Sequence, residues 1–284
     1  DYDSQAVADG WTRYNWTGYE GKGAYPAYHH LVTTMEGIGE ERGCGRALWE
    51  NNEANSEYGT TMALMLLPHW TGGCIASMEG LFFEATASTN YHFITAAAVS
   101  ESASNPVRQL RYTNNDADLG VRHMRDLGVR YLMVRTDAAK REASVAEGLA
   151  LVGTSGTWDI FELADSNIVE ALSVEPVVAT QAVDDWYKPG DARERNLELG
   201  TSWFQNRSDW PAVPVDDGPA EWQRVDVEIV DDQRVEPFDD QARKVDFVRP
   251  VDELVPRPLE QIDVTGVEIG EQSIDFDVDQ IGVP

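Results

Sequence analysis

The chain has 284 residues, with 50 acidic and 22 basic residues and a formal net charge of −28. This length allows one large domain or two ordinary ones. So much negative charge repels phosphates and anionic headgroups, which excludes nucleic acid as a partner. The charge is also typical of an acidic proteome or a high-salt habitat, and that alone would account for it.

The first 57 residues are rich in aromatic residues and glycine. A helix is predicted over Ala27–Ile38, because Leu31, Val32 and Met35 then share one face. The glycines around residue 44 would end it.

Cys44 and Cys74 are the only cysteines, and both stand next to glycine. A single pair in an otherwise cysteine-free chain predicts one disulfide and an oxidising compartment. Closing a loop of about 30 residues would contribute on the order of 3 kcal/mol. Two unrelated reduced thiols are the alternative. Metal binding by the pair is not favoured, since no metal-ligand spacing accompanies it.

Residues 58–105 are dense in Met, Phe, Trp, Tyr and His and carry few charges. Such a segment is either the core of a domain or a surface that meets something apolar. No run of about 18 apolar residues occurs, so no segment of this chain is predicted to span a membrane.

From about residue 118 the pattern alternates between helices and strands, which predicts a sheet covered by helices. The predicted elements are a helix near 119–126 ended by Gly128, a strand at Val129–Val134, a helix at Ala138–Leu149, and strands at Leu151–Val152, Trp158–Leu163 and Val174–Ala182. A further helix is predicted after Pro189. Together these give an α/β (α+β) domain over residues 1–207.

Residues 208–284 are predicted to form a smaller all-β module, a sandwich or jelly roll. Val225, Val227 and Ile229 alternate with acidic residues, as in half-buried strands. The same alternation recurs near residue 276, and the pattern is incomplete at Pro284. Because the chain also begins without Met, we expect it to be an excised or processed part of a larger protein.

The acidic run at Asp275, Asp277 and Asp279 invites a calcium hypothesis. An EF-hand loop needs glycine at its sixth position, and Gln280 stands there instead. A solvated strand face is therefore favoured. We predict no metal site, no cofactor and no catalytic residue, since no nucleotide, protease or hydrolase motif is present.

Sugar binding is the remaining hypothesis, because aromatic rings stack on sugars while carboxylates and amides bind hydroxyls. The candidate ligand-binding residues are Trp11, Trp16, His69, Trp70, Glu79, Glu84 and His92. Glu79 and Glu84 could also act as the carboxylate pair that glycoside hydrolysis needs. Core packing of the aromatic residues is the competing interpretation.

Several segments resemble a family of large actinobacterial membrane proteins. They are Gly45–Glu50, Tyr58–Thr71, Ser77–Glu84, Ser104–Val107, His123–Met133 and Phe276–Pro284. That family is often labelled as related to 6-pyruvoyl-tetrahydropterin synthase, but its members look like polytopic glycosyltransferases of the GT-C type. The resemblance covers most of the chain and is strongest from Tyr25 to Leu163.

The resemblance implies that this chain is an extracytoplasmic region that follows the transmembrane helices of its parent protein. Enzymes of that type generally carry their catalytic acidic residue in a loop between early membrane helices, so no catalytic residue is transferred to this chain. The implied role is to support binding of a cell-envelope glycan or a lipid-linked sugar. The alternatives are a secreted glycan hydrolase that uses Glu79 and Glu84, and a structural or partner-binding domain without a small ligand.

Overall fold

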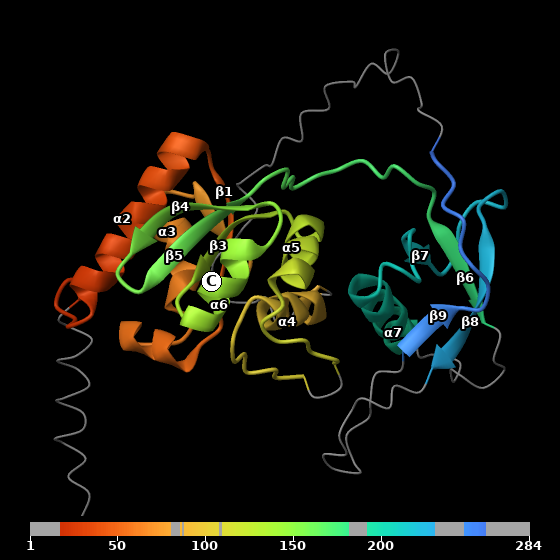
Figure 1. The fold of residues 1–284 in the computed structure, drawn as a ribbon, viewed down its shortest axis with the longest axis horizontal. Helices are drawn as coiled ribbons and strands as arrows, with labels where there is room; N and C mark the ends of the chain where they lie inside the picture. Colours follow the sequence, from red (N-terminus) through yellow and green to blue (C-terminus); the bar gives the residue numbers. More distant parts are fainter. Residues whose placement is uncertain are drawn as a thin grey trace, which may run out of the picture.

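The computed structural model describes residues 18–80, 86, 88–107, 110–181, 192–230 and 247–259. They form two mixed sheets surrounded by helices (Figure 1). The first sheet has five strands and the second has four. The predicted class, an α/β (α+β) domain followed by a smaller sheet module, is confirmed.

The first unit contains the larger sheet. Its elements are α2 (Tyr25–Arg42), β1 (Gly45–Trp49), η1 (Glu53–Tyr58), η2 (Ala63–Leu66), α3 (Leu67–Trp70), β2 (Ile75–Ser77), α4 (Thr89–Ala98), α5 (Ala117–Asp126), β3 (Val129–Val134), α6 (Asp137–Val145), β4 (Leu149–Ser155) and β5 (Trp158–Leu163). The predicted strands at β3 and β5 have the observed bounds. The helix predicted over Ala138–Leu149 ends earlier, at Val145, because Ala146 has an extended backbone with φ −68° and ψ 132°. Gly148, with a φ of +94°, then completes the turn into β4.

The strand order in the first sheet is β2-β1-β3-β5-β4. β1 pairs in parallel with both β2 and β3. β5 runs antiparallel to β3 and to β4. The three parallel strands therefore end at one common edge of the sheet, where the loops that follow them meet.

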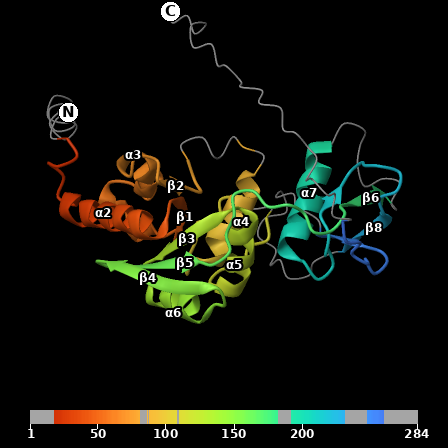
Figure 2. The same ribbon diagram turned by 90° about the horizontal axis from the view of Figure 1, so that it is seen from above.

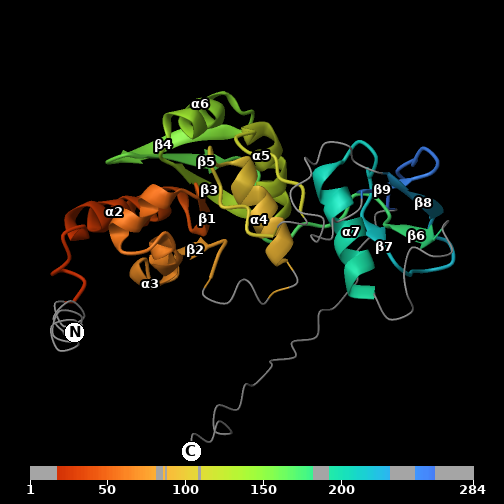
Figure 3. The same cartoon turned by 90° about the horizontal axis from the view of Figure 1, so that it is seen from below.

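Helices cover both faces of this sheet, as Figure 3 shows. On one face α2, η2 and α3 pack with the sheet around Met35, Leu67 and Trp158. On the other face α5 and α6 pack around Met124 and Leu132. Both clusters are almost fully buried, so the aromatic-rich segment contributes in part to the core.

The predicted disulfide is present. Cys44 and Cys74 are bonded, with their Cα atoms 4.6 Å apart, and they account for both cysteines of the chain. Cys44 precedes β1 and Cys74 precedes β2, so the bond joins the amino ends of two neighbouring parallel strands.

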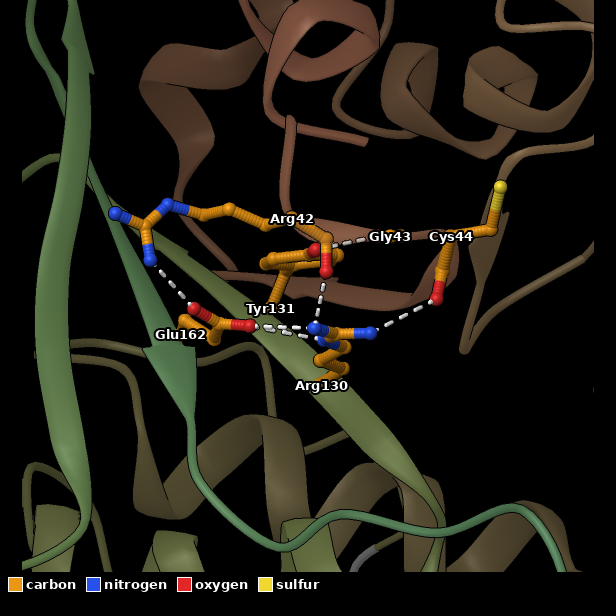
Figure 4. A network of polar contacts seen from close by, with 6 residues as sticks. All are labelled: Arg42, Gly43, Cys44, Arg130, Tyr131 and Glu162. Atoms are coloured by element: carbon orange, nitrogen blue, oxygen red, sulfur yellow. Dashed lines mark hydrogen bonds and ion pairs between the residues drawn. The ribbon is translucent and has the colours of Figure 1, made fainter. Parts of the chain in front are cut away.

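A polar network fixes the same edge of the sheet (Figure 4). Arg130 donates to the Glu162 carboxylate from Nε at 3.0 Å and from Nη2 at 2.7 Å. Its Nη1 also donates to the carbonyl of Cys44 at 3.3 Å, and Arg42 donates to the second oxygen of Glu162 at 2.9 Å. These contacts hold the turn between α2 and β1 against the sheet. The polar groups at the amino ends of the parallel strands therefore stabilise the fold.

The second unit consists of β6 (Val177–Gln181), α7 (Ala192–Gln205), β7 (Pro214–Val215), β8 (Arg224–Val230) and β9 (Phe247–Pro250). Its strand order is β7-β6-β8-β9, and only the pairing of β8 with β9 is antiparallel. Trp210 is fully buried there and donates from Nε1 to the carbonyl of Val248 at 3.0 Å. Figure 2 shows α7 beside this sheet, on the side of the first unit.

The alternation predicted for β8 is confirmed over its first four residues, since Val225 and Val227 are buried and Arg224 and Asp226 are exposed. It does not extend to Glu228 and Ile229, which are both half-buried. The second sheet also contains β6, which precedes residue 208 in the chain. The second alternating segment and the proposed calcium ligands Asp275, Asp277 and Asp279 lie outside the described residues.

Contacts of α4 and α5 with α7 and the residues just after it join the two units. The ring of His123 stacks on Phe204 with centroids 4.0 Å apart, and its Nε2 lies 3.1 Å from the carbonyl oxygen of Phe204. Asp126 pairs with Arg207, and Tyr91 packs on the backbone at Gly200.

Within the described ranges, no helix is both long and apolar enough to cross a membrane.

Candidate functional site

A pocket of about 120 Å³ opens at the carboxyl edge of the first sheet. It lies where β1 and β2 end and where α4 and its following loop pass by. The residues that line it are Asn51, Met62, Glu79, Phe93, Ala96, Ala103, Ser104, Asn105 and Pro106. In sheets with parallel strands, ligands bind in the crevice outside the carboxyl ends of the strands, so this is the candidate site.

Asn51, two residues after β1, organises one wall of the pocket. Its backbone N–H donates to the hydroxyl of Ser100 at 2.8 Å, and its side-chain oxygen accepts from the backbone N–H of Ser104 at 3.1 Å. These bonds tie the loop after α4 to the end of β1. The position of the wall is therefore set by the sheet.

Glu79 supplies the carboxylate of the pocket. Its backbone N–H donates to the hydroxyl of Ser77 at 3.2 Å, and that hydroxyl donates to the Glu79 carbonyl. This local turn directly after β2 fixes the backbone of Glu79. The side chain is only 4% exposed, so the pocket holds a largely dehydrated carboxylate.

Asn105 has an unusual backbone for its position. Its φ is +46°, in the left-handed region, and Pro106 follows it. Its side-chain nitrogen donates to Asn114 at 3.2 Å, while its side-chain oxygen is buried without a hydrogen-bond partner among the described residues. Asparagine adopts the left-handed region more readily than most residues. The unsatisfied acceptor costs stability, and a ligand that donates a hydrogen bond would remove that cost.

At the same edge of the sheet, the space between the ends of β1 and β3 is occupied by the side chain of Glu50. Glu50 is fully buried, and its carboxylate accepts from the backbone N–H groups of Arg135 at 2.7 Å and Thr136 at 2.9 Å. The hydroxyl of Thr136 also donates to it, at 2.7 Å. Since Thr136 caps α6, the anion-binding end of this helix is occupied by a side chain of the chain.

The predicted ligand residues fall in different places. Glu79 lines the pocket. His92 lies in α4, next to the pocket residue Phe93, but is itself buried; burial, together with the positive charge of Arg46, lowers its pKa to about 4. His92 is therefore neutral near pH 7 and belongs to the packing of the helix.

His69 and Trp70 lie in α3, on the face of the sheet covered by α2. Trp70 is half-buried, and Tyr19 stacks on it with centroids 4.7 Å apart and an interplanar angle of 17°. One face of the indole is thus covered by another ring. Trp11, Trp16 and Glu84 lie outside the described residues, so the separation of Glu79 and Glu84 is not described.

The sequence did not indicate Asn51, Phe93 or Asn105 as site residues. Asn51 carries a recognisable signal, since it follows a buried strand and would lie at the carboxyl edge of a parallel sheet. Asn105 carries a weaker one, because an Asn–Pro pair favours a turn. Phe93 has none, since aromatic residues also fill cores.

The pocket combines one carboxylate, two amides, a serine hydroxyl and an aromatic ring. These groups can accept hydrogen bonds from the hydroxyls of a ligand and donate hydrogen bonds to them, while the aromatic ring contacts an apolar face of the ligand. Among the described residues, no group of three His, Cys, Asp or Glu side chains could hold a metal ion.

No family model, no curated protein and no solved structure matches the chain.

Proposed function

We propose that this chain is a non-catalytic glycan-binding region that supports a membrane glycosyltransferase in cell-envelope assembly, on the extracytoplasmic side. The pocket at the ends of β1 and β2 carries this proposal, because Glu79, Asn51 and Asn105 surround one small cavity. The family resemblance of the sequence supplies the setting, and the disulfide supports an oxidising compartment.

Hydroxyl recognition accounts for the side chains of the pocket. A carboxylate accepts hydrogen bonds from two adjacent hydroxyls, and an amide both donates and accepts. Phe93, Met62 and Pro106 provide apolar surface for the faces of a sugar ring. The buried side-chain oxygen of Asn105 has no hydrogen-bond partner among the described residues, so it favours a ligand that donates a hydrogen bond to it.

The test is a thermal-shift titration of the purified, oxidised chain with arabinan, galactan and mannan oligomers. A ligand at about a hundred times its dissociation constant stabilises the native state by roughly 2.7 kcal/mol. We expect a dose-dependent rise in Tm with at least one of these glycans. No rise with any of them would contradict the proposal and favour a scaffold or partner-binding role.

Asn105→Gly is the variant that links binding to the pocket. Glycine adopts a positive φ without strain, so the fold should be retained while the amide is lost. The glycan-dependent shift should fall. Asn115→Gly is the matched control, because Asn115 also has a left-handed backbone, with a φ of 55°, but does not line the pocket.

Hydrolysis is the alternative chemistry for the same pocket, since Glu79 is a buried carboxylate. Incubation with the same oligomers, followed by an assay for new reducing ends, separates the two functions. Our proposal expects no cleavage. Cleavage that Glu79→Gln abolishes and Glu101→Gln, at an exposed position, preserves would replace it with a glycan hydrolase.

A further inference from the structure

The disulfide and the pocket lie at opposite ends of the same two strands. Cys44 directly precedes β1 and Cys74 directly precedes β2. The pocket residues Asn51 and Glu79 come two residues after the carboxyl ends of these strands. Since β2 is only three residues long, it forms a short link between the bond and Glu79.

Cys44 is attached to the centre of the sheet. Its carbonyl accepts from Nη1 of Arg130 at 3.3 Å, and the carbonyl of the preceding Gly43 accepts from the hydroxyl of Tyr131 at 2.6 Å (Figure 4). Arg130 and Tyr131 belong to β3, the middle strand of the five. The position of Cys44 is therefore set by contacts other than the disulfide.

Cys74 follows a segment with more conformational freedom. Gly72 and Gly73 precede it with φ values of 60° and 87°, and a Cβ at either would meet no atom within 4 Å. The N–H groups of Gly73 and Cys74 donate to Pro68 and Thr71, so the hydrogen bonds of this turn stay within the segment. Two consecutive glycines in open surroundings permit many backbone conformations. The disulfide is thus a strong constraint on the start of β2.

β2 is an edge strand, and among the described residues its one strand neighbour is β1. The helices that precede it are better anchored, because Leu64 and Leu67 are buried in the core. Glu79 moves with β2, since its backbone N–H donates to the hydroxyl of Ser77 and its carbonyl accepts from the same hydroxyl. The part of the chain that depends most on the bond is therefore residues 72–79.

The rest of the first sheet is formed independently of the disulfide. β1, β3, β5 and β4 pair with one another, and the cluster around Met124 and Leu132 fills the face away from α2. The opposite wall of the pocket is tied to the end of β1 through Asn51 and Ser104. Loss of the bond should thus act on the Glu79 side of the pocket and leave the other side in place.

We propose that the Cys44–Cys74 disulfide positions the pocket: it fixes β2, and with it Glu79, to the centre of the sheet. Ligand binding then requires the oxidised chain, while most of the first unit folds without the bond. This inference rests on the proposed function and adds a redox dependence to the same site. Cys44 is exposed and can be reached by a reductant. A dithiol that breaks the S–S bond supplies two electrons and two protons, leaves two cysteine thiols and becomes a disulfide itself.

Hydrogen exchange followed by mass spectrometry tests the proposal without a ligand. The oxidised chain is compared with the chain reduced by dithiothreitol and with the double variant Cys44→Ser, Cys74→Ser. In both, the backbone N–H groups of residues 74–79 should exchange at least about tenfold faster, and those of β3 and β5 should be unchanged. Dithiothreitol added to the double variant controls for the reductant and should have no effect.

Two results would overturn the proposal. Equal exchange of residues 74–79 in the oxidised and reduced chains would mean that the packing of Ile75 and Met78 is enough to hold β2. Faster exchange throughout the first unit would mean that the bond stabilises the whole fold and has no particular role at the pocket.

Glycan binding supplies the second measurement. For a glycan that raises the Tm of the oxidised chain, the Kd from calorimetry should rise at least about tenfold on reduction. In Glu79→Gln the effect of reduction should be smaller, because the side chain that the bond positions is altered. Glu101→Gln, exposed on the loop after α4, is the matched control and should keep the full effect. The same effect of reduction in both variants would contradict a coupling through Glu79.

The two measurements separate this inference from the proposed function. A glycan whose Kd does not change on reduction would overturn the inference and leave glycan binding intact. If no glycan binds the oxidised chain, the proposed function fails, whereas faster exchange limited to residues 74–79 would still support the role of the bond.

Discussion

The hydroxyl of Thr136 donates to the carboxylate of Glu50 at 2.7 Å, and this bond joins the end of β1 to the start of α6. The same carboxylate accepts from two backbone N–H groups. A buried charge is thereby satisfied by three donors and by the helix dipole. The contact positions the loops at the carboxyl edge, where the candidate pocket lies.

Replacing Glu50 should destabilise the protein strongly. Glu50 is fully buried, and Glu50→Ala leaves its three part-buried donors without their acceptor, so the free energy of unfolding should fall by about 3 kcal/mol or more. Glu50→Gln should lose less stability, because the amide oxygen of glutamine can still accept a hydrogen bond from these donors. Urea denaturation measures both, and Glu53→Gln at an exposed position is the control. A Glu50→Ala variant as stable as the parent would show that α6 is held by other contacts.

Two glycines in α2 should respond in opposite directions to the same substitution. A Cβ at Gly39 would lie 2.8 Å from Cys74 Sγ, which the disulfide holds in place, so Gly39→Ala should destabilise the fold by about 1–3 kcal/mol. A Cβ at Gly37 would meet no atom within 4 Å, so Gly37→Ala should stabilise it by about 0.5–1 kcal/mol. Thermal and urea unfolding of the two variants would show whether each substitution raises or lowers the stability. Equal effects would mean that α2 does not approach the disulfide as closely as described.

Acid should weaken the fold through its buried histidines. Burial is the main reason that the pKa of His123 is lowered to about 3, with the positive charges of Arg122 and Arg207 acting in the same direction. Between about pH 3 and the ordinary histidine value of roughly 6.5, the unfolded chain binds a proton that the folded chain does not. The stability contributed by neutral His123 is therefore complete above pH 6.5 and is lost as the pH falls toward 3.

The measurement is urea unfolding at several values between pH 4 and 7. His123→Gln should reduce the slope of the unfolding free energy against pH by on the order of 1 kcal/mol per pH unit, since glutamine does not titrate. His29→Gln, at an exposed position of α2, should leave the slope as it is. A slope that His123→Gln does not change would rule out this histidine as a source of the acid sensitivity.

Salt should stabilise the chain. With 50 acidic and 22 basic residues, repulsion among carboxylates opposes the compact state. The screening length falls from about 10 Å at 0.1 M to about 3 Å at 1 M, so Tm should rise by several degrees over this range. Thermal unfolding in NaCl, with sucrose of equal osmolality as the uncharged comparison, measures the electrostatic part. A Tm that rises no more in salt than in sucrose would show that the negative charges are too far apart to matter.

Local patterns determined much of the secondary structure. The bounds of β3 and β5 follow from short, mostly apolar segments that each come after a glycine-containing turn. The helix that ends before Gly128 follows from its apolar spacing and its C-terminal glycine. Where the prediction was inaccurate, the cause was local as well. The helix after β3 ends at Val145 because Ala146 turns to an extended backbone, a change that helix propensity alone does not reveal, since alanine is a strong helix former.

The sequence by itself determined the class of the fold, the disulfide and the charge, because each depends on composition or on neighbours along the chain. The tertiary structure alone decided the site. Asn51 and Glu79 are far apart in sequence and meet because the parallel strands β1 and β2 end at one edge of the sheet. Asn105 joins them because the loop after α4 is bonded to Asn51 through Ser104. It also decided that Trp70 packs under Tyr19 and that Glu50 fills a helix end. Such assignments depend on which surfaces pack together, and periodicity along a chain carries no information about that.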